Sequence, residues 1–94
     1  MRVLLSGISR RRLHEIHSYI AHHDAAAASR VRERIIRSID LLAEHPSLGF
    51  PWRETRTRAL MVPGLPYRIH YEVVADTVYV LTIVHTRQKP PEGF

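Results

Sequence analysis

The most regular pattern in the chain is the alternation in residues 67–73, YRIHYEV. Its polar positions are Arg68, His70 and Glu72, and every residue between them is apolar or aromatic. Successive side chains of a β-strand point to opposite faces of the sheet, so the pattern predicts a half-buried strand over residues 67–74. The face expected to receive the core consists of Tyr67, Ile69, Tyr71 and Val73. The opposite face, with a cation, an imidazole and a carboxylate in a row, is expected to be open to solvent.

Two earlier segments have apolar residues at helical spacing instead. A first helix is predicted from Ser9, as its N-cap, to about His22, and a second from the N-cap Asp24 to a stop at Pro46. The first apolar stripe consists of Leu13, Ile16 and Ile20. The second consists of Ala28, Val31, Ile35, Ile39 and Leu42. The link between the segments is short, which predicts an antiparallel helical hairpin.

The remaining segments complete a small sheet. A short first strand ends at Gly7, the segment HPSLGFPW is predicted to be a loop, and an Ala-Asp turn joins the strand at 67–74 to another strand at 78–84. A further short strand is predicted over residues 58–62. The order β-α-α-β-β-β indicates an α+β fold in which the helical hairpin packs on one face of a mainly antiparallel sheet. The chain is predicted to be a single domain, residues 1–94, with a surface tail over residues 86–94.

Charge and composition restrict the kinds of partner and location. The chain of 94 residues has a net charge of +5, and 13 of its 14 basic residues are arginine, the exception being Lys89. A basic surface favours an acidic partner, either nucleic acid or an acidic protein segment. The sequence contains no cysteine and no apolar run of the roughly 20 residues that a membrane span needs. A cytoplasmic protein without membrane association is therefore expected.

Neither a metal site nor a cofactor site is predicted. Four histidines on or after the first predicted helix are interpreted as solvated side chains, because no carboxylate completes a ligand set at helical spacing. They are His14, His17, His22 and His23. The glycines form neither of the two common nucleotide-binding motifs. No cofactor is expected.

Acid–base chemistry on a phosphodiester is the remaining catalytic possibility. Metal-free RNA cleavage needs a base, an acid and cations for the developing phosphorane charge. Arg68, His70 and Glu72 are suitable types on one strand face, and His85 and Arg87 lie at the end of the neighbouring strand. The alternative is a solvated polar sheet face with no catalytic purpose. The side of the sheet on which His85 lies depends on the last strand. Both the odd and the even positions of residues 79–84 are mainly apolar, so either set could face the core. If Tyr79, Leu81 and Ile83 face the helices, His85 shares their face and points away from Arg68.

Two longer segments resemble a known family. LLAEHPSLGFPW is similar to the helix end and following loop of the RelE/ParE superfamily of type II toxin–antitoxin toxins. ALMVPGLPYRIHYEV, followed by VYVLTIVHTR, resembles the central hairpin of that superfamily. The resemblance implies a growth-inhibiting toxin of a plasmid-stabilisation module, held in a hetero-oligomer by a small cognate antitoxin.

The branches of this superfamily differ in their targets. ParE-like members inhibit DNA gyrase, and the helical hairpin and the HPSLGFP loop resemble this branch more closely. RelE-like members are ribosome-dependent mRNA endonucleases, and the resemblance to them implies catalytic roles for Arg68, His85, Arg87 and Glu72. The loop before the sheet lacks the lysines and the tail lacks the tyrosine of that branch. A third reading is a degenerate, non-toxic member that only binds its antitoxin. The face expected to bind antitoxin or target carries Arg58, Arg68, His70 and Glu72.

Overall fold

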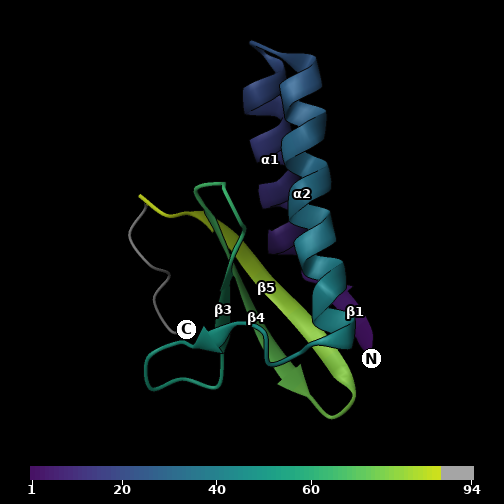
Figure 1. Ribbon diagram of the computed structural model, residues 1–94, viewed down its shortest axis with the longest axis vertical. Coiled ribbons are helices and arrows are strands. Elements are labelled where there is room, and N and C mark those ends of the chain that lie inside the picture. Colours follow the sequence, from purple (N-terminus) through teal and green to yellow (C-terminus); the bar gives the residue numbers. More distant parts are fainter. Residues whose placement is uncertain (88–94) are drawn as a thin grey trace.

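The computed structural model describes residues 1–87 as two helices and five strands (Figure 1). The N-terminal part contains β1 (Arg2–Leu5), α1 (Gly7–Ala21) and α2 (Ala25–Glu44). The C-terminal part contains β2 (Phe50–Pro51), β3 (Arg58–Met61), β4 (Tyr67–Val74) and β5 (Thr77–His85). The predicted tail over residues 86–94 lies outside the described residues from position 88 onward.

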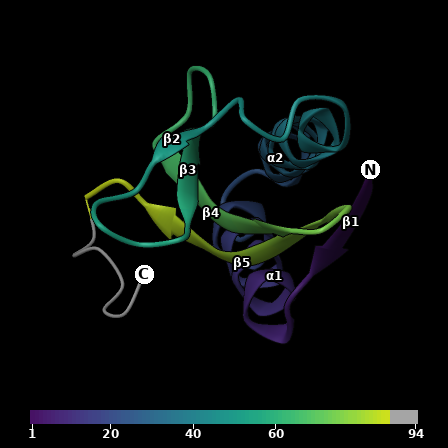
Figure 2. The same ribbon diagram turned by 90° about the horizontal axis from the view of Figure 1, so that it is seen from below.

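The strands form one mixed sheet in the order β1-β5-β4-β3-β2. Strand β1 runs parallel to β5, and all other neighbours are antiparallel. The helical hairpin lies on one side of the sheet, and the segment between β2 and β3 swings away from the helices (Figure 2). This arrangement confirms the predicted α+β class. It adds one strand, β2, to the prediction. Phe50 and Pro51 lie within the predicted loop, but they pair with Ala59 and Arg58 of β3.

The start of α1 differs from the prediction. The N-cap is Ser6, whose Oγ accepts a hydrogen bond of 3.0 Å from the Ser9 N–H, and Gly7 is the first helical residue. Ser9 is instead fully buried in the first turn, where its hydroxyl donates to the carbonyl oxygens of Ser6 and Val80. Serine is a favourable N-cap residue, so the sequence suits either position. Ser6 is the cap because the Ser9 hydroxyl is bonded to Val80 of β5. The second N-cap, Asp24, is confirmed by its bond from the Ala27 N–H.

The core lies between α2 and the sheet. The apolar stripe of α2 is buried as predicted, with Ile35 and Leu42 at 0% exposure. It packs with Leu13 of α1 and a sheet cluster of Ile69, Tyr71, Val78, Val80 and Ile83. The prediction is wrong for Val73, which is 36% exposed. Val73 lies beside Pro46 and Ser47 of the loop after α2, so the helices do not cover it.

An irregularity in β5 determines which of its residues face the helices. His70 pairs with Thr82, whereas the next residue, Tyr71, pairs with Val80, so Leu81 is an extra residue in the ladder. Such a bulge reverses the facing of every residue beyond it. Before the bulge the even positions Val78 and Val80 join the core cluster, and after it the odd position Ile83 does.

Candidate functional site

A compact polar cluster lies on the sheet face that points away from the helices. Arg68 and His70 of β4 stand there beside Val84 and Thr82 of β5. The prediction of an open face is wrong for both residues, since Arg68 is only 8% exposed and His70 is 0% exposed. The half-buried side chain of Trp52, from the segment joining β2 to β3, covers them.

The three side chains of this cluster are in direct contact. Arg68 Cζ lies 4.6 Å from the centroid of the Trp52 ring, within the range of a cation–π interaction. The His70 ring meets Trp52 edge-on, with centroids 4.8 Å apart. Arg68 Nε donates a hydrogen bond of 2.8 Å to His70 Nε2. We call Trp52, Arg68 and His70 the Trp52 cluster.

The hydrogen bond fixes the protonation of His70. Because Nε2 accepts from a guanidinium, the imidazole must be neutral with its proton on Nδ1. Burial lowers the pKa of His70 to about 4, and the positive charges of Arg68 and Arg53 act in the same direction. Burial, followed by the charge of Arg53, also lowers the pKa of Arg68, which remains a cation at neutral pH. His70 therefore carries no charge at neutral pH, and its Nε2 lone pair is already engaged.

His85 lies on the other side of the sheet. Its ring packs against Tyr67, with centroids 5.5 Å apart, and both residues line a hollow that faces Ile16 and Tyr19 of α1. Arg68, the neighbour of Tyr67, points to the opposite face. The structure thus separates the imidazole and the guanidinium that cleavage of RNA would need to converge. His85 shares the face of Ile83, whereas before the bulge Val78 and Val80 face the core in place of Tyr79.

The other predicted site residues are dispersed. Arg58 pairs with Tyr71 in the ladder, and its guanidinium donates to the carbonyl oxygens of Gly49 and Ser47. Glu72 is partly exposed on β4, and Arg87 is exposed just beyond β5. Two pairs of the predicted residues are joined by hydrogen bonds within residues 1–87. The side chains of Arg68 and His70 are bonded to each other, and the Arg87 N–H donates one bond of 3.1 Å to His85 Nδ1. Trp52 was missed because a single aromatic residue in a loop does not reveal which sheet face it covers.

A tyrosine of the core fixes the loop that follows α2. Tyr71 is fully buried, accepts a hydrogen bond of 2.9 Å from the Gly49 N–H and donates one of 2.7 Å to the Pro46 carbonyl. With the two bonds from Arg58, this ties the HPSLG segment to the sheet. The position of the segment that carries Trp52 therefore depends on these contacts.

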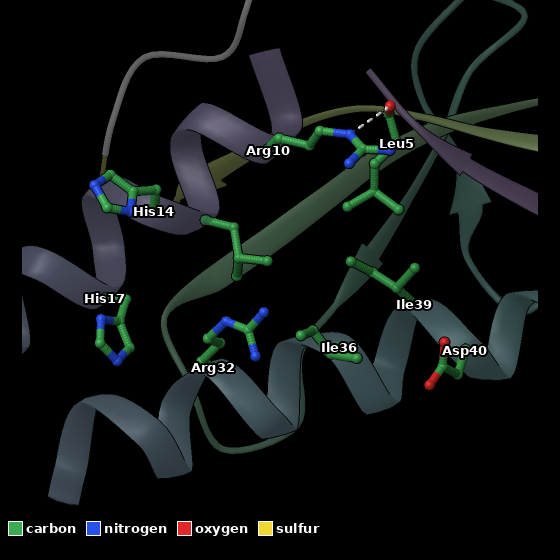
Figure 3. Close-up of a pocket in the computed structure, with 9 residues that line it drawn as sticks. Leu5, Arg10, His14, His17, Arg32, Ile36, Ile39 and Asp40 are labelled. Carbon is green, nitrogen blue, oxygen red and sulfur yellow. Dashed lines mark hydrogen bonds between the residues drawn. The ribbon is translucent and has the colours of Figure 1, made fainter. Parts of the chain in front are cut away.

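A groove of about 430 Å³ runs between the helices beside β1 (Figure 3). Its floor is apolar and consists of Leu5, Leu13, Ile36 and Ile39. Its rim carries Arg10, His14, His17, Arg32 and Asp40. Arg10 reaches across to β1, where its Nε donates to the Leu5 carbonyl. We call this the helical groove; it offers an apolar strip with a mainly basic edge.

Two further features concern metals and membranes. Across residues 1–87, no three side chains of metal-ligating type gather in one place. None of the helices in this range has the length and apolar character required to cross a bilayer.

Comparison with known proteins identifies the family. Residues 3–90 match the family model described as the ParE toxin of the type II toxin–antitoxin system parDE. The chain is 44% identical over 82 residues to "Putative toxin Y4kP" of Sinorhizobium fredii, covering 87% of this chain and 84% of that protein. Its fold is similar to a solved chain from the chromosomal ParDE system of P. aeruginosa, with a TM-score of 0.80 at 17% identity over 90% of this chain and 95% of that chain. This chain therefore belongs to the ParE toxin family of type II toxin–antitoxin systems.

Proposed function

We propose that this ParE-family toxin inhibits growth in the cytoplasm by binding DNA gyrase, without cleaving RNA. The placement of Arg68 supports this choice most directly. Its guanidinium is covered by Trp52, while His85 lies on the opposite face of the sheet. The group that transfers the proton and the cation that stabilises the phosphorane charge must both reach the same scissile phosphodiester. Cleavage by Arg68 and His85 would require both to reach the same side of the sheet.

The proposal is tested by inducing the gene and assaying the purified chain in parallel. Growth arrest, inhibition of gyrase supercoiling and intact ribosome-bound mRNA are the expected results. The matched variant is Arg68→Ala, which should leave translation unaffected, as the unaltered chain does. Codon-specific cuts in a translating extract that Arg68→Ala abolishes would instead establish the RelE-like alternative. Absence of growth arrest would favour the degenerate, antitoxin-binding reading.

We further propose that a cognate antitoxin neutralises the toxin by laying an amphipathic acidic segment into the helical groove. The similar solved chain comes from a chromosomal ParDE TA system of P. aeruginosa, and the matching family is the toxin of a toxin–antitoxin system. Helix-in-groove recognition combines apolar anchors with matched charge, and the floor and rim of the groove supply both. The resulting assembly is a hetero-oligomer of toxin and antitoxin.

Charge reversal on the rim distinguishes this docking mode. We expect Arg32→Glu to weaken co-purification with the small protein encoded beside the gene by about tenfold or more, because a like charge then faces an acidic partner. The control is Arg30→Glu, which changes another exposed arginine of α2 that does not line the groove. Growth inhibition by the free toxin should persist in both variants. Equal retention of the partner by the two variants would contradict docking in the groove.

A further inference from the structure

Two buried donors in the Trp52 cluster have no acceptor within residues 1–87. They are one terminal guanidinium nitrogen of Arg68, Nη2, and the indole nitrogen of Trp52, Nε1. The groups that carry them are in contact, since Arg68 Cζ lies 4.6 Å from the ring centroid. Within residues 1–87 the guanidinium of Arg68 forms no ion pair with a carboxylate, since the one salt bridge in this range joins Arg12 and Glu15. A buried cation without an anion is energetically unfavourable, so a hydrogen-bond acceptor that bound here would stabilise the site.

A second cation, Arg53, contacts the same indole ring. Arg53 Cζ lies 5.0 Å from the Trp52 ring centroid, so two guanidinium groups contact one indole. The Arg53 side chain is exposed, and its charge is close enough to lower the pKa of both Arg68 and His70. Its backbone has φ of 52°, in the left-handed region that a non-glycine residue seldom occupies. The site therefore combines a recessed cation with an exposed one.

Trp52 and Arg53 belong to a turn that is closed by its own hydrogen bonds. The Trp52 N–H donates to the Thr57 carbonyl, and the Thr55 hydroxyl donates to the Trp52 carbonyl at 2.6 Å. These bonds lie within the turn, so the turn holds its own shape. Because both donor nitrogens are buried, binding of an outside group to them would require the turn to tilt from the sheet.

We propose that Trp52, Arg53 and Arg68 form a recessed binding site for one carboxylate presented by an acidic protein segment. The two carboxylate oxygens accept from Arg68 Nη2 and Trp52 Nε1, and Arg53 closes over the bound group. A carboxylate ends a flexible side chain and can enter a recess, whereas a phosphodiester carries a sugar on each side. Carboxylate is therefore favoured over a nucleic-acid phosphate. The site is on the sheet face away from the helices, separate from the helical groove, and it rests on the proposed function only in taking an acidic protein as partner.

Trp52 is the only tryptophan, so its fluorescence reports directly on the site. The full chain is titrated at constant ionic strength with a short blocked peptide containing glutamates, and with the same peptide carrying glutamine instead. We expect a saturable change in emission with the glutamate peptide and none with the glutamine peptide. The comparison uses the unaltered protein and needs neither gyrase nor antitoxin, so its failure is distinguishable from failure of the proposed function. Equal responses to the two peptides would overturn the proposal.

Three variants assign the response to named side chains. Arg68→Lys keeps the charge but loses the planar fork of donors, and should weaken binding of the glutamate peptide by about tenfold. Arg53→Ala removes an exposed side chain that the fold does not need, and should weaken it by roughly threefold. The control Arg30→Ala, on α2, should leave the affinity unchanged. If Arg68→Lys does not fold, Arg53→Ala and the comparison of the two peptides still test the proposal. An unchanged affinity of Arg53→Ala for the glutamate peptide would contradict the proposed carboxylate site.

The source of the anion is tested by competition. A single-stranded oligonucleotide with the same number of charges is added to the protein already saturated with the glutamate peptide. We expect displacement only at concentrations well above those of the peptide. Displacement at lower concentrations would show that the site prefers phosphate, and would overturn the assignment to a carboxylate.

Discussion

Replacing Gly49 by alanine is expected to destabilise the protein by about 3 kcal/mol or more. A Cβ at this position would lie 2.7 Å from the Ala59 carbonyl oxygen and 2.8 Å from the Tyr71 hydroxyl. Neither neighbour can give way easily, since one is backbone of β3 and the other is a fully buried core side chain. The clash adds to the loss of the Gly49 N–H bond to Tyr71, whose hydroxyl also holds the Pro46 carbonyl.

The matched control for this substitution is Gly7→Ala. Nothing lies within 4 Å of a Cβ added there, and Gly7 is the first residue of α1. Alanine in a helix restricts the unfolded chain more than glycine does, so this variant should gain up to about 1 kcal/mol. Urea unfolding of both variants gives the two changes in free energy. Similar values for Gly49→Ala and Gly7→Ala would show that the loop is not held as closely as the structure indicates.

The second large effect is a loss of stability on acidification that depends on His70. The pKa of His70 is lowered from 6.5 to about 4 in the folded protein, chiefly by burial. As the pH falls below 6.5, the unfolded chain takes up a proton at this position and the folded protein does not. The free energy of unfolding therefore decreases between pH 6.5 and about 4, and this contribution levels off below pH 4. A shift of this size corresponds to roughly 3 kcal/mol.

His70→Gln isolates that contribution from the titration of other groups. Glutamine can still accept a hydrogen bond from Arg68 but does not titrate. Free energies of unfolding are measured from pH 7.5 to 3.5 for both proteins, and their difference is plotted against pH. We expect the unaltered protein to lose stability more steeply between pH 6.5 and 4. Parallel curves for the two proteins would mean that His70 is not desolvated by Trp52 and its neighbours.

The neutral His70 and the covered Arg68 also bear on the choice of target. His70 is neutral at neutral pH and its Nε2 accepts from Arg68, so it does not supply a second positive charge to a bound phosphate. Arg68 is already in contact with an aromatic ring. The arrangement therefore favours binding of a protein segment on this face over cleavage of a phosphodiester.

Much of the architecture follows from the sequence alone. Apolar spacing was sufficient to predict both helices, and Asp24 was recognised as a cap because its carboxylate satisfies a free N–H of the first turn. Ile35 and Leu42 were predicted as core because a stripe at helical spacing must bury one face. The resemblance of HPSLGFPW and the following hairpin to RelE/ParE toxins also indicated the correct family.

The tertiary structure determines which side chains make up the candidate site. Alternation in residues 67–73 shows which side chains share a face, and it correctly put Arg68 and His70 together. It does not show what covers that face, because the cover is Trp52, which comes from a different part of the chain. Nor does it show a bulge. The one extra residue, Leu81, changes the facing of the rest of β5 and places His85 beside Tyr67, away from Arg68. Local periodicity thus determined which side chains share a face within each regular stretch. The bulge and long-range packing determined which face is covered and which polar groups can meet.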